Sequence, residues 1–232
     1  MISGIPVTMV LILVNLGLFV VTALQAGSIT GNNRSSLFLQ SSLIPAIVAH
    51  LDQWYRLLTS AFMHFGPIHL LLNMLILLIL GNGIERAVGP LRFTVIYVVS
   101  ALGGSAAVMW FAPMSNTAGA SGAIFGLMGG YAVLALVLKA RAQGILSLIA
   151  LNVVVSVIVP GVSMAGHFGG LAVGVLVTLA LIVLPRKLPA SIGRTTRQTL
   201  AWGLTALIAV ACLAVAYFFG AELAVTTRLV AE

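Results

Sequence analysis

Seven long apolar runs divide the sequence, and they restrict its fold more than any other feature. A helix needs roughly 20 mostly apolar residues to cross the hydrocarbon core of a bilayer. None of the runs alternates apolar and polar residues as the strands of a membrane barrel do. We therefore predict an all-α fold, a polytopic bundle of transmembrane helices. The runs are Ile5–Gln25, Ile68–Gly83, Leu91–Phe111, Gly122–Leu138, Ile145–Val159, Phe168–Leu184 and Leu200–Phe219; the second and fifth are short for a span.

Composition excludes several classes of protein. Of the 232 residues, 61% are hydrophobic and 6% are charged, whereas a water-soluble domain is about 25% charged. The net charge of +7 comes from basic residues scattered between apolar runs, which argues against a nucleic-acid partner. The single cysteine, Cys212, excludes a disulfide within the chain and a cysteine-based metal site. No HExxH motif is present, and we expect neither a metal nor a cofactor.

The charges between the runs predict the orientation. With the N-terminus in the cytoplasm, eight of the 11 basic residues lie in cytoplasmic connections and three lie outside, as the positive-inside rule requires. The loop Ala26–Gly66, roughly 40 residues long, is then external and long enough to fold on itself. The eight are Arg86, Arg92, Lys139, Arg141, Arg186, Lys187, Arg194 and Arg197, and the three are Arg34, Arg56 and Arg228.

Acidic residues are absent from the apolar runs. Asp52 falls in the external loop, Glu85 at a predicted cytoplasmic turn, and Glu222 in the predicted C-terminal tail. An aspartyl intramembrane protease needs paired carboxylates, so that class is disfavoured. A proton pump or cation transporter that works through carboxylates is disfavoured for the same reason.

Four other polar side chains are expected at one depth near the outer face. Ser121 precedes the fourth run and His167 precedes the sixth. His69 and Asn73 lie four residues apart at the start of the second, and so on one helix face. The even-numbered runs all pass from outside to inside in this topology, so these starts lie at a similar level. Three separate segments thus bring a hydroxyl, an imidazole and two hydrogen-bond donors together.

Glycine spacing predicts that the fourth and sixth helices pack closely. Glycines at every fourth residue let membrane helices approach, which would bring the Ser121 hydroxyl within about 2.6–3.2 Å of the His167 ring. No acidic residue is placed to orient the ring, so we predict a Ser–His dyad in which His167 is the base. His69, Asn73 and the Ser121 backbone N–H are the expected oxyanion donors. The glycines are Gly122, Gly126 and Gly130, and Gly166, Gly170 and Gly174.

Each of these residues alone has a simpler explanation. A serine among glycines usually serves packing, a histidine at a helix end is often interfacial, and Asn73 could link helices by a hydrogen bond. The GASG tetrapeptide, Gly119–Gly122, lacks the last glycine of a nucleophile elbow and follows no strand. The prediction therefore depends on the combination.

The combination resembles the rhomboid family of intramembrane serine proteases. The similarity spans roughly Trp54 to Gly174 and follows the helix order. The resemblance implies a six-helix core with Ser121 and His167 as the dyad, and with His69 and Asn73 at the positions that stabilise the oxyanion. The matching elements are Trp54-Tyr55-Arg56, Met63-His64-Phe65 with His69 and Asn73, Gly119-Ala120-Ser121-Gly122, and Ala165-Gly166-His167-Phe168-Gly169-Gly170.

Four further residues are assigned supporting roles. By resemblance, Gly119 matches the glycine two residues before the nucleophile, and Arg56 matches a structural element of the first loop, although Tyr55 interrupts the usual Trp-Arg pair. Phe125 stands where many members carry the tyrosine that stacks on the catalytic histidine. For His64 we expect a structural or water-retaining role.

The remaining expectations concern organisation and partners. We expect a rhomboid-like core over residues 1–196 and an additional transmembrane helix with a tail over 197–232, as in the six-plus-one bacterial arrangement. The implied partners are transmembrane protein substrates, cleaved near the outer face of a bacterial inner membrane, and membrane lipids. The alternative is a non-proteolytic rhomboid-like protein or a transporter that binds transmembrane clients.

Overall fold

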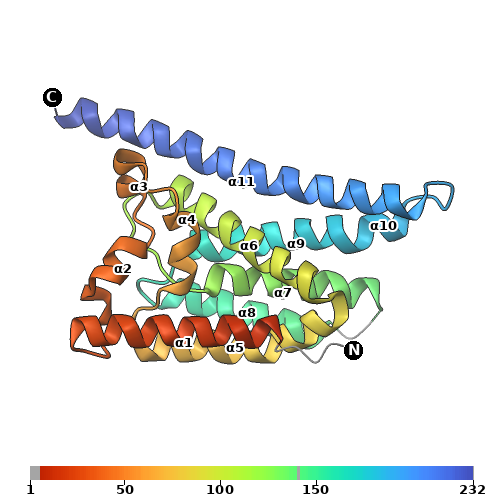
Figure 1. Cartoon of the computed structure of the whole chain (residues 1–232), viewed down its shortest axis with the longest axis horizontal. Helices are drawn as coiled ribbons and strands as arrows, with labels where there is room; N and C mark the ends of the chain where they lie inside the picture. The colour runs from red at the N-terminus through yellow and green to blue at the C-terminus, as the bar shows by residue number, and fades with distance from the viewer. Residues whose placement is uncertain (1–5, 140–141, 232) are drawn as a thin grey trace.

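The computed structural model describes residues 6–139 and 142–231, and within them the chain is helical apart from connections and one isolated bridge between Leu43 and Thr117 (Figure 1). Five of the described helical stretches are long and apolar enough to cross a membrane, and two shorter helices are also apolar. The predicted all-α, polytopic bundle is confirmed. The long stretches are α1 (Val7–Ala26), α5 (Gly66–Val88), α6 (Pro90–Phe111), α9 (Met164–Thr178) with its continuation, and α11 (Arg194–Ala231), and the shorter helices are α7 (Ser121–Val137) and α8 (Gln143–Ile158).

The sixth predicted span is one continuous helical stretch of three pieces. A π-helical segment, η3 (Leu179–Val183), and a short helix, α10 (Leu184–Lys187), follow α9 directly. Large apolar side chains such as Leu13, Ile68 and Leu207 point outward and are more than half exposed. This surface is suited to hydrocarbon, where the helices satisfy their own backbone groups.

The second span is longer than predicted, and Glu85 does not lie at the predicted turn. The apolar run ends at Gly83, but α5 continues to Val88, so Glu85 lies in a helix and not at a turn. Its carboxylate is buried and accepts hydrogen bonds from the backbone N–H groups of Val7 and Thr8, at 2.8 and 2.9 Å, and from the Thr8 hydroxyl at 2.7 Å. The N-terminus of α1, with its unpaired N–H groups and positive dipole end, is thus a partner for this charge.

The seventh span is also longer than predicted. The apolar run Leu200–Phe219 is the middle of α11, whose 38 residues extend into polar sequence at both ends. Glu222 therefore lies in a helix and not in a tail. The expected division at residues 196 and 197 falls within the first turn of α11, and the division into core and added helix stays a prediction. An apolar run predicts only the part of a helix that suits hydrocarbon. Polar residues can continue the helix beyond that run.

The external loop of the prediction is folded into short helices at one end of the bundle (Figure 1). Arg56 holds it together: its guanidinium is buried and donates to the carbonyls of Leu39 and Ser42, each at 2.7 Å, and to the Gln53 side chain at 2.7 Å. The short helices are η1 (Asn32–Arg34), α2 (Ser36–Ser41), α3 (Pro45–Leu51), α4 (Arg56–Thr59) and η2 (Ser60–Phe62).

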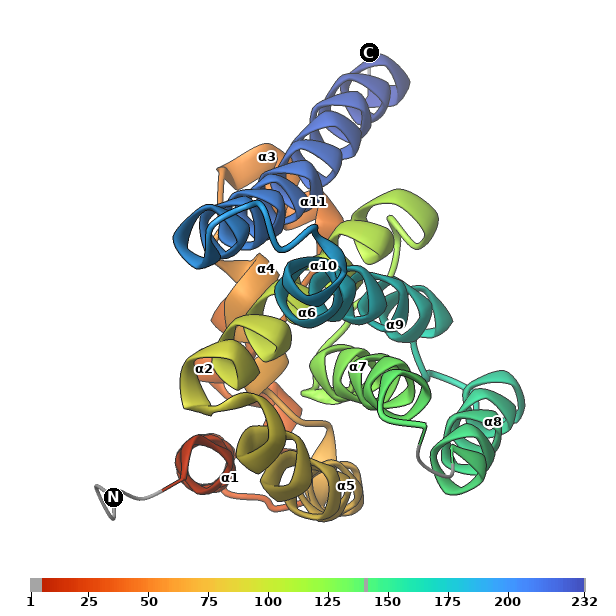
Figure 2. The ribbon, with the colours of Figure 1, turned by 90° about the vertical axis from the view of Figure 1, so that its right-hand side faces the viewer.

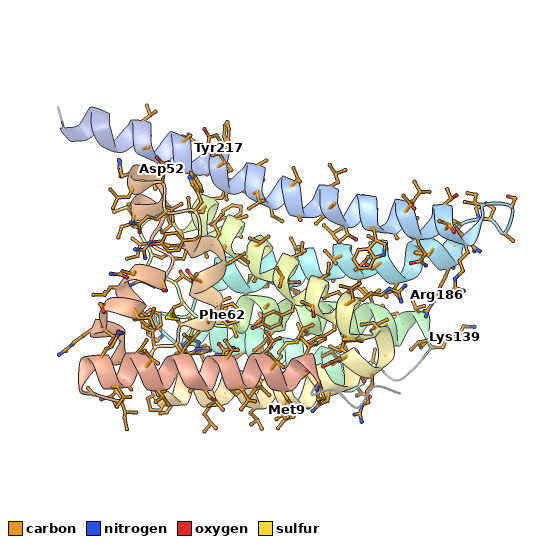
Figure 3. All side chains as sticks on the ribbon, viewed as in Figure 1. Met9, Asp52, Phe62, Lys139, Arg186 and Tyr217 are labelled. Atoms are coloured by element: carbon orange, nitrogen blue, oxygen red, sulfur yellow. The ribbon has the colours of Figure 1, made fainter. Side chains whose placement is uncertain are left out.

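Charged side chains separate toward the two ends of the bundle. Lys139 and Arg186 lie at the end opposite Asp52 (Figure 3), as the order of the runs requires. Arg141 and the side chain of Arg228 lie outside the described residues.

Helices α7 and α9 cross at glycines. A Cβ atom built on Gly170 would overlap the carbonyl of Gly122, and one built on Gly174 would overlap the backbone of Gly126. The two glycine stripes therefore face each other, as predicted, and backbone meets backbone. Helix α8 lies at the edge of the bundle beside α7 (Figure 2), and its buried residues are Ile145 and Ser156.

Candidate functional site

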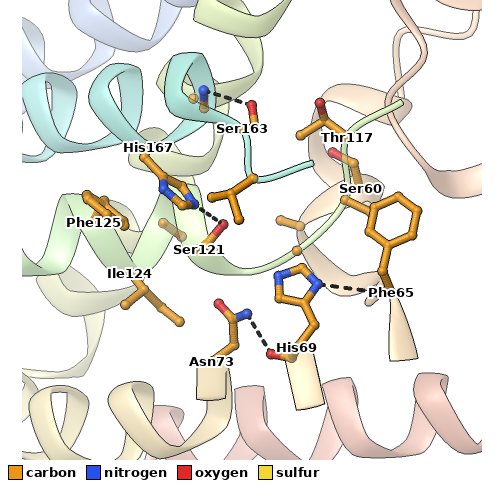
Figure 4. Close-up of a pocket in the computed structure, with 18 of the residues that line it drawn as sticks. Ser60, Phe65, His69, Asn73, Thr117, Ser121, Ile124, Phe125, Ser163 and His167 are labelled. Carbon is orange, nitrogen blue, oxygen red and sulfur yellow. Dashed lines mark hydrogen bonds between the residues drawn. The ribbon is translucent and has the colours of Figure 1, made fainter. Parts of the chain in front are cut away.

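Ser121 and His167 meet at the starts of two helices. Ser121 is the first residue of α7, and His167 lies in the first turn of α9. The Nε2 atom of His167 is 2.8 Å from the Ser121 Oγ (Figure 4). The glycine contacts between α7 and α9 continue directly below this pair and hold it in register. The spatial relation predicted from spacing is present, within the distance that proton transfer needs.

The turn before α7 needs a glycine at position 119. Gly119 has φ of +133°, a backbone conformation that side chains rarely adopt. Its N–H donates to the carbonyl of Ser60 at 2.9 Å. A Cβ atom there would lie 2.8 Å from Cε1 of His69. The missing side chain thus lets the His69 ring approach the backbone just ahead of Ser121.

His69 and Asn73 offer hydrogen-bond donors to the same space. The backbone N–H of Phe65 donates to Nδ1 of His69 at 3.3 Å, so in the neutral ring the proton is on Nε2. The Asn73 amide donates one proton to the His69 carbonyl at 2.8 Å and keeps a second. Both side chains line the cavity that contains Ser121, and in Figure 4 they lie below Ser121 while His167 lies above it.

Phe125 packs on the imidazole of His167. The two rings are stacked, with centroids 4.1 Å apart and planes inclined by 16°. Phe125 lies one turn after Ser121 on α7, so the helix that carries the hydroxyl also carries a support for the ring. The packing restricts rotation of the imidazole without any hydroxyl on the aromatic ring.

His64 lies behind the site and not among the residues that line the cavity. It is buried, its ring centroid is 5.2 Å from that of His69, and its Nε2 accepts from the backbone N–H of Ala120 at 3.5 Å. Burial, and to a smaller extent the neighbouring His69, lower the pKa of His64 to about 3. A neutral His64 supports the turn before Ser121. Arg56, in the folded loop, does not line the cavity either.

A cavity of about 700 Å³ surrounds Ser121 and His167. Residues from α5, α6, α7, α8 and α9 line it, and most of them are apolar or glycine. Its size is that of a site for a small molecule or a few residues of a peptide. Among the described residues no cluster of three or more His, Cys, Asp or Glu side chains could hold a metal ion.

Sequence reasoning missed one polar contact of His167. The Oγ of Ser156, on α8, lies 2.7 Å from the His167 Nδ1. The predicted dyad rests on the lack of an acidic residue placed to orient the ring, and Ser156, which is not acidic, is separated from His167 by a turn. No spacing rule distinguishes Ser156 from the other serines of the chain, so only the packing of α8 against α9 identifies it.

Comparison with known proteins gives consistent matches. The family model described as the Rhomboid domain matches residues 51–184, a range that contains every site residue discussed above. RHOMBOID-like protein 4 of Arabidopsis thaliana is 35% identical over 65% of this chain and 40% of its own length. The Rhomboid protease GluP of Bacillus subtilis is 37% identical over 56% of this chain and 26% of its own length.

A third relative is covered more fully. The Rhomboid protease AarA of Providencia stuartii is 26% identical over 80% of this chain and 76% of its own length. The chain therefore spans well under two thirds of the first two relatives and about three quarters of the third.

Proposed function

This chain belongs to the rhomboid family and is a multi-pass membrane protein, and from that premise we propose that it is an intramembrane serine endopeptidase. Ser121 is the nucleophile and His167 the general base. The observation that carries the proposal is the 2.8 Å contact between the His167 Nε2 and the Ser121 Oγ inside a cavity among the helices. A serine that served only helix packing would not require a hydrogen bond to an imidazole.

Cleavage proceeds by acyl transfer. As Ser121 Oγ attacks the scissile carbonyl carbon, its proton passes to Nε2 of His167. The C–N bond then breaks, and the proton moves from Nε2 to the leaving amine. Water attacks the acyl-enzyme by the same route, with His167 first taking a proton and then returning it to Ser121. Protons and charge balance over the two halves without a metal or cofactor.

The oxyanion of each tetrahedral intermediate is stabilised by hydrogen-bond donors that are already in place. His69 supplies its Nε2–H and Asn73 its second amide proton. The backbone N–H of Ser121, in the first turn of α7, has no intrahelical acceptor. Donors of this kind contribute about 10²–10³-fold in kcat each. We expect His69→Phe and Asn73→Ala to lower kcat by factors in this range.

Transmembrane protein segments are the proposed substrates. A regular helix engages its carbonyls in its own hydrogen bonds, so a substrate must unwind locally, and small or helix-breaking residues near the scissile bond favour this. We propose lateral access past α8 and the turn at residues 159–163, which line the cavity. Lipid contacts the outward-facing apolar side chains.

The orientation is part of the proposal. Leu43, Ser60 and Ala61 of the folded loop line the cavity of the site. Lys139 and Arg186 lie at the end of the bundle opposite Asp52 of the same loop (Figure 3). By the positive-inside rule the N-terminus is cytoplasmic and the site faces the extracytoplasmic side of a bacterial inner membrane. An accessibility assay on single cysteines introduced at Asn33 and Lys187 tests this in cells.

The test of the activity is cleavage of a model transmembrane substrate in liposomes, with the products mapped. Wild-type protein and Ser147→Ala, which changes an exposed serine of α8, should cleave and should be labelled by a fluorophosphonate. Ser121→Ala and His167→Ala should do neither while keeping the wild-type melting temperature. Cleavage by Ser121→Ala would refute the assignment. An unlabelled, folded wild-type protein would favour a non-proteolytic protein that binds transmembrane clients.

A further inference from the structure

A chain of three hydrogen bonds runs through the imidazole of His167 from α7 to α8. At one end His167 Nε2 contacts Ser121 Oγ at 2.8 Å. On the far side of the ring, Nδ1 contacts Ser156 Oγ at 2.7 Å, and that oxygen lies 2.7 Å from the carbonyl oxygen of Asn152. Ser156 is 4% exposed, so water does not compete for its hydroxyl.

The direction of these bonds follows from the number of protons. A serine hydroxyl has one proton, and a carbonyl oxygen can only accept, so Ser156 donates to Asn152. The same oxygen must then accept from His167, which places the ring proton on Nδ1. In a neutral imidazole this leaves the lone pair on Nε2, the atom that faces Ser121.

We infer that Ser156 is a positioning residue, which holds His167 in the one neutral tautomer that can accept the proton of Ser121. This inference rests on the proposed function, in which His167 is the general base. The opposite tautomer would carry its proton on Nε2 and could not act as a base. Ser156 thus takes the place that an acidic residue occupies in a Ser-His-Asp triad, with a neutral hydroxyl as the acceptor.

The surroundings of Ser156 support this role over simple packing. Helix α8 lies at the edge of the bundle (Figure 2), and its buried residues are one isoleucine and this serine. An apolar residue would fill the same volume without a polar group to satisfy. The hydroxyl also keeps its contact when the ring becomes an imidazolium, because Nδ1–H donates in both states. Phe125 covers a face of the ring, so Ser156 and Phe125 together determine its plane and its tautomer.

The experiment compares Ser156→Thr with Ser156→Val in the liposome assay. The two side chains have the same branched shape and similar helix propensity, but only threonine keeps the hydroxyl. Ser156→Val should lower kcat by about 10- to 100-fold, the usual effect of one hydrogen bond to a charged group, with KM changed less than about 2-fold. Ser156→Thr should keep kcat near the wild-type value. In both variants the rate of fluorophosphonate labelling at Ser121 should change in parallel with kcat.

Controls separate this inference from protein stability and from the proposed function. Ser147→Ala, which changes an exposed serine on the same helix, should leave kcat unchanged. Ser156→Ala also removes the hydroxyl and replaces the valine variant if that variant folds poorly. Wild-type kcat in Ser156→Val or Ser156→Ala would overturn the inference while the proposed function stands. Equal losses in the valine and threonine variants would also overturn it, since shape would then matter and not the hydroxyl. Cleavage by Ser121→Ala would overturn both proposals together.

Discussion

A single added methyl group between α7 and α9 should separate Ser121 from His167. Gly170 lies one turn below His167 on α9, and a Cβ atom there would overlap the carbonyl of Gly122. Backbone atoms of two packed helices cannot turn aside as a flexible side chain can. Non-bonded carbon atoms need about 3.5–4.0 Å, so in Gly170→Ala the two helices must move apart by roughly 1 Å.

The consequence for activity follows from the geometry of the pair. The Ser121 and His167 side chains are 2.8 Å apart, and an increase of ~1 Å exceeds the limit of a hydrogen bond. A displacement of this size costs on the order of 10²-fold in rate. The overpacked crossing should also destabilise the protein by about 1–3 kcal/mol. We expect Gly170→Ala to insert and fold but to cleave about 10²-fold more slowly.

The measurement is kcat and KM for a model substrate in liposomes, with the melting temperature recorded in detergent. Gly203→Ala is the matched control, because a Cβ atom on Gly203 in α11 meets nothing within 4 Å. It should keep wild-type activity and gain about 1 kcal/mol of helix stability. A Gly170→Ala protein with wild-type kcat would show that α7 and α9 do not determine the spacing of the pair.

Three further predictions concern buried polar groups. Glu85→Gln should lower the free energy of unfolding by about 2 kcal/mol, read as the melting temperature, because the charge that binds the start of α1 is lost; an unchanged value would contradict this. Arg56→Lys should destabilise by about 2–4 kcal/mol, measured in the same way, since an ammonium cannot reproduce the contacts to Leu39 and Ser42. In the folded protein burial lowers the pKa of His64 to about 3, whereas in the unfolded chain its pKa is the ordinary 6.5. Between these two pH values the unfolded chain therefore binds a proton that the folded protein does not. The free energy of unfolding therefore decreases as the pH falls through 6.5, by about 1.4 kcal/mol at pH 5.5. Between pH 7.5 and 5.5 the free energy of unfolding of His64→Gln should decrease less than that of wild type. An equal decrease in the two proteins would exclude His64 as the cause.

Much of the fold could be predicted from the sequence because the bilayer imposes a length and a polarity on each span. The seven runs match seven helical stretches, and α6, α7 and α8 begin or end within two residues of their predictions. The larger differences are at the ends of α5, of α11 and of the stretch from α9 to α10, where residues outside the apolar run continue the helix. Hydropathy predicts which part of a helix lies in hydrocarbon and not where its backbone hydrogen bonds end. From the sequence Glu85 is therefore expected at a turn and Glu222 in a tail, although both lie in helices.

The sequence by itself determined that Ser121, His167 and His69 lie near the starts of their helices, with Asn73 one turn after His69 on the same helix face. The order of the apolar runs and the spacing of the residues are enough to predict this, because neither changes on folding. Only the tertiary structure decided which atoms touch. The tautomer of His69 depends on the N–H of Phe65, and that of His167 depends on the hydroxyl of Ser156. The spacing of these residues in the sequence does not predict that the groups lie close together. A hydrogen bond needs two atoms within a few tenths of an ångström of one distance, and that precision comes from the packing of α7, α8 and α9 against each other.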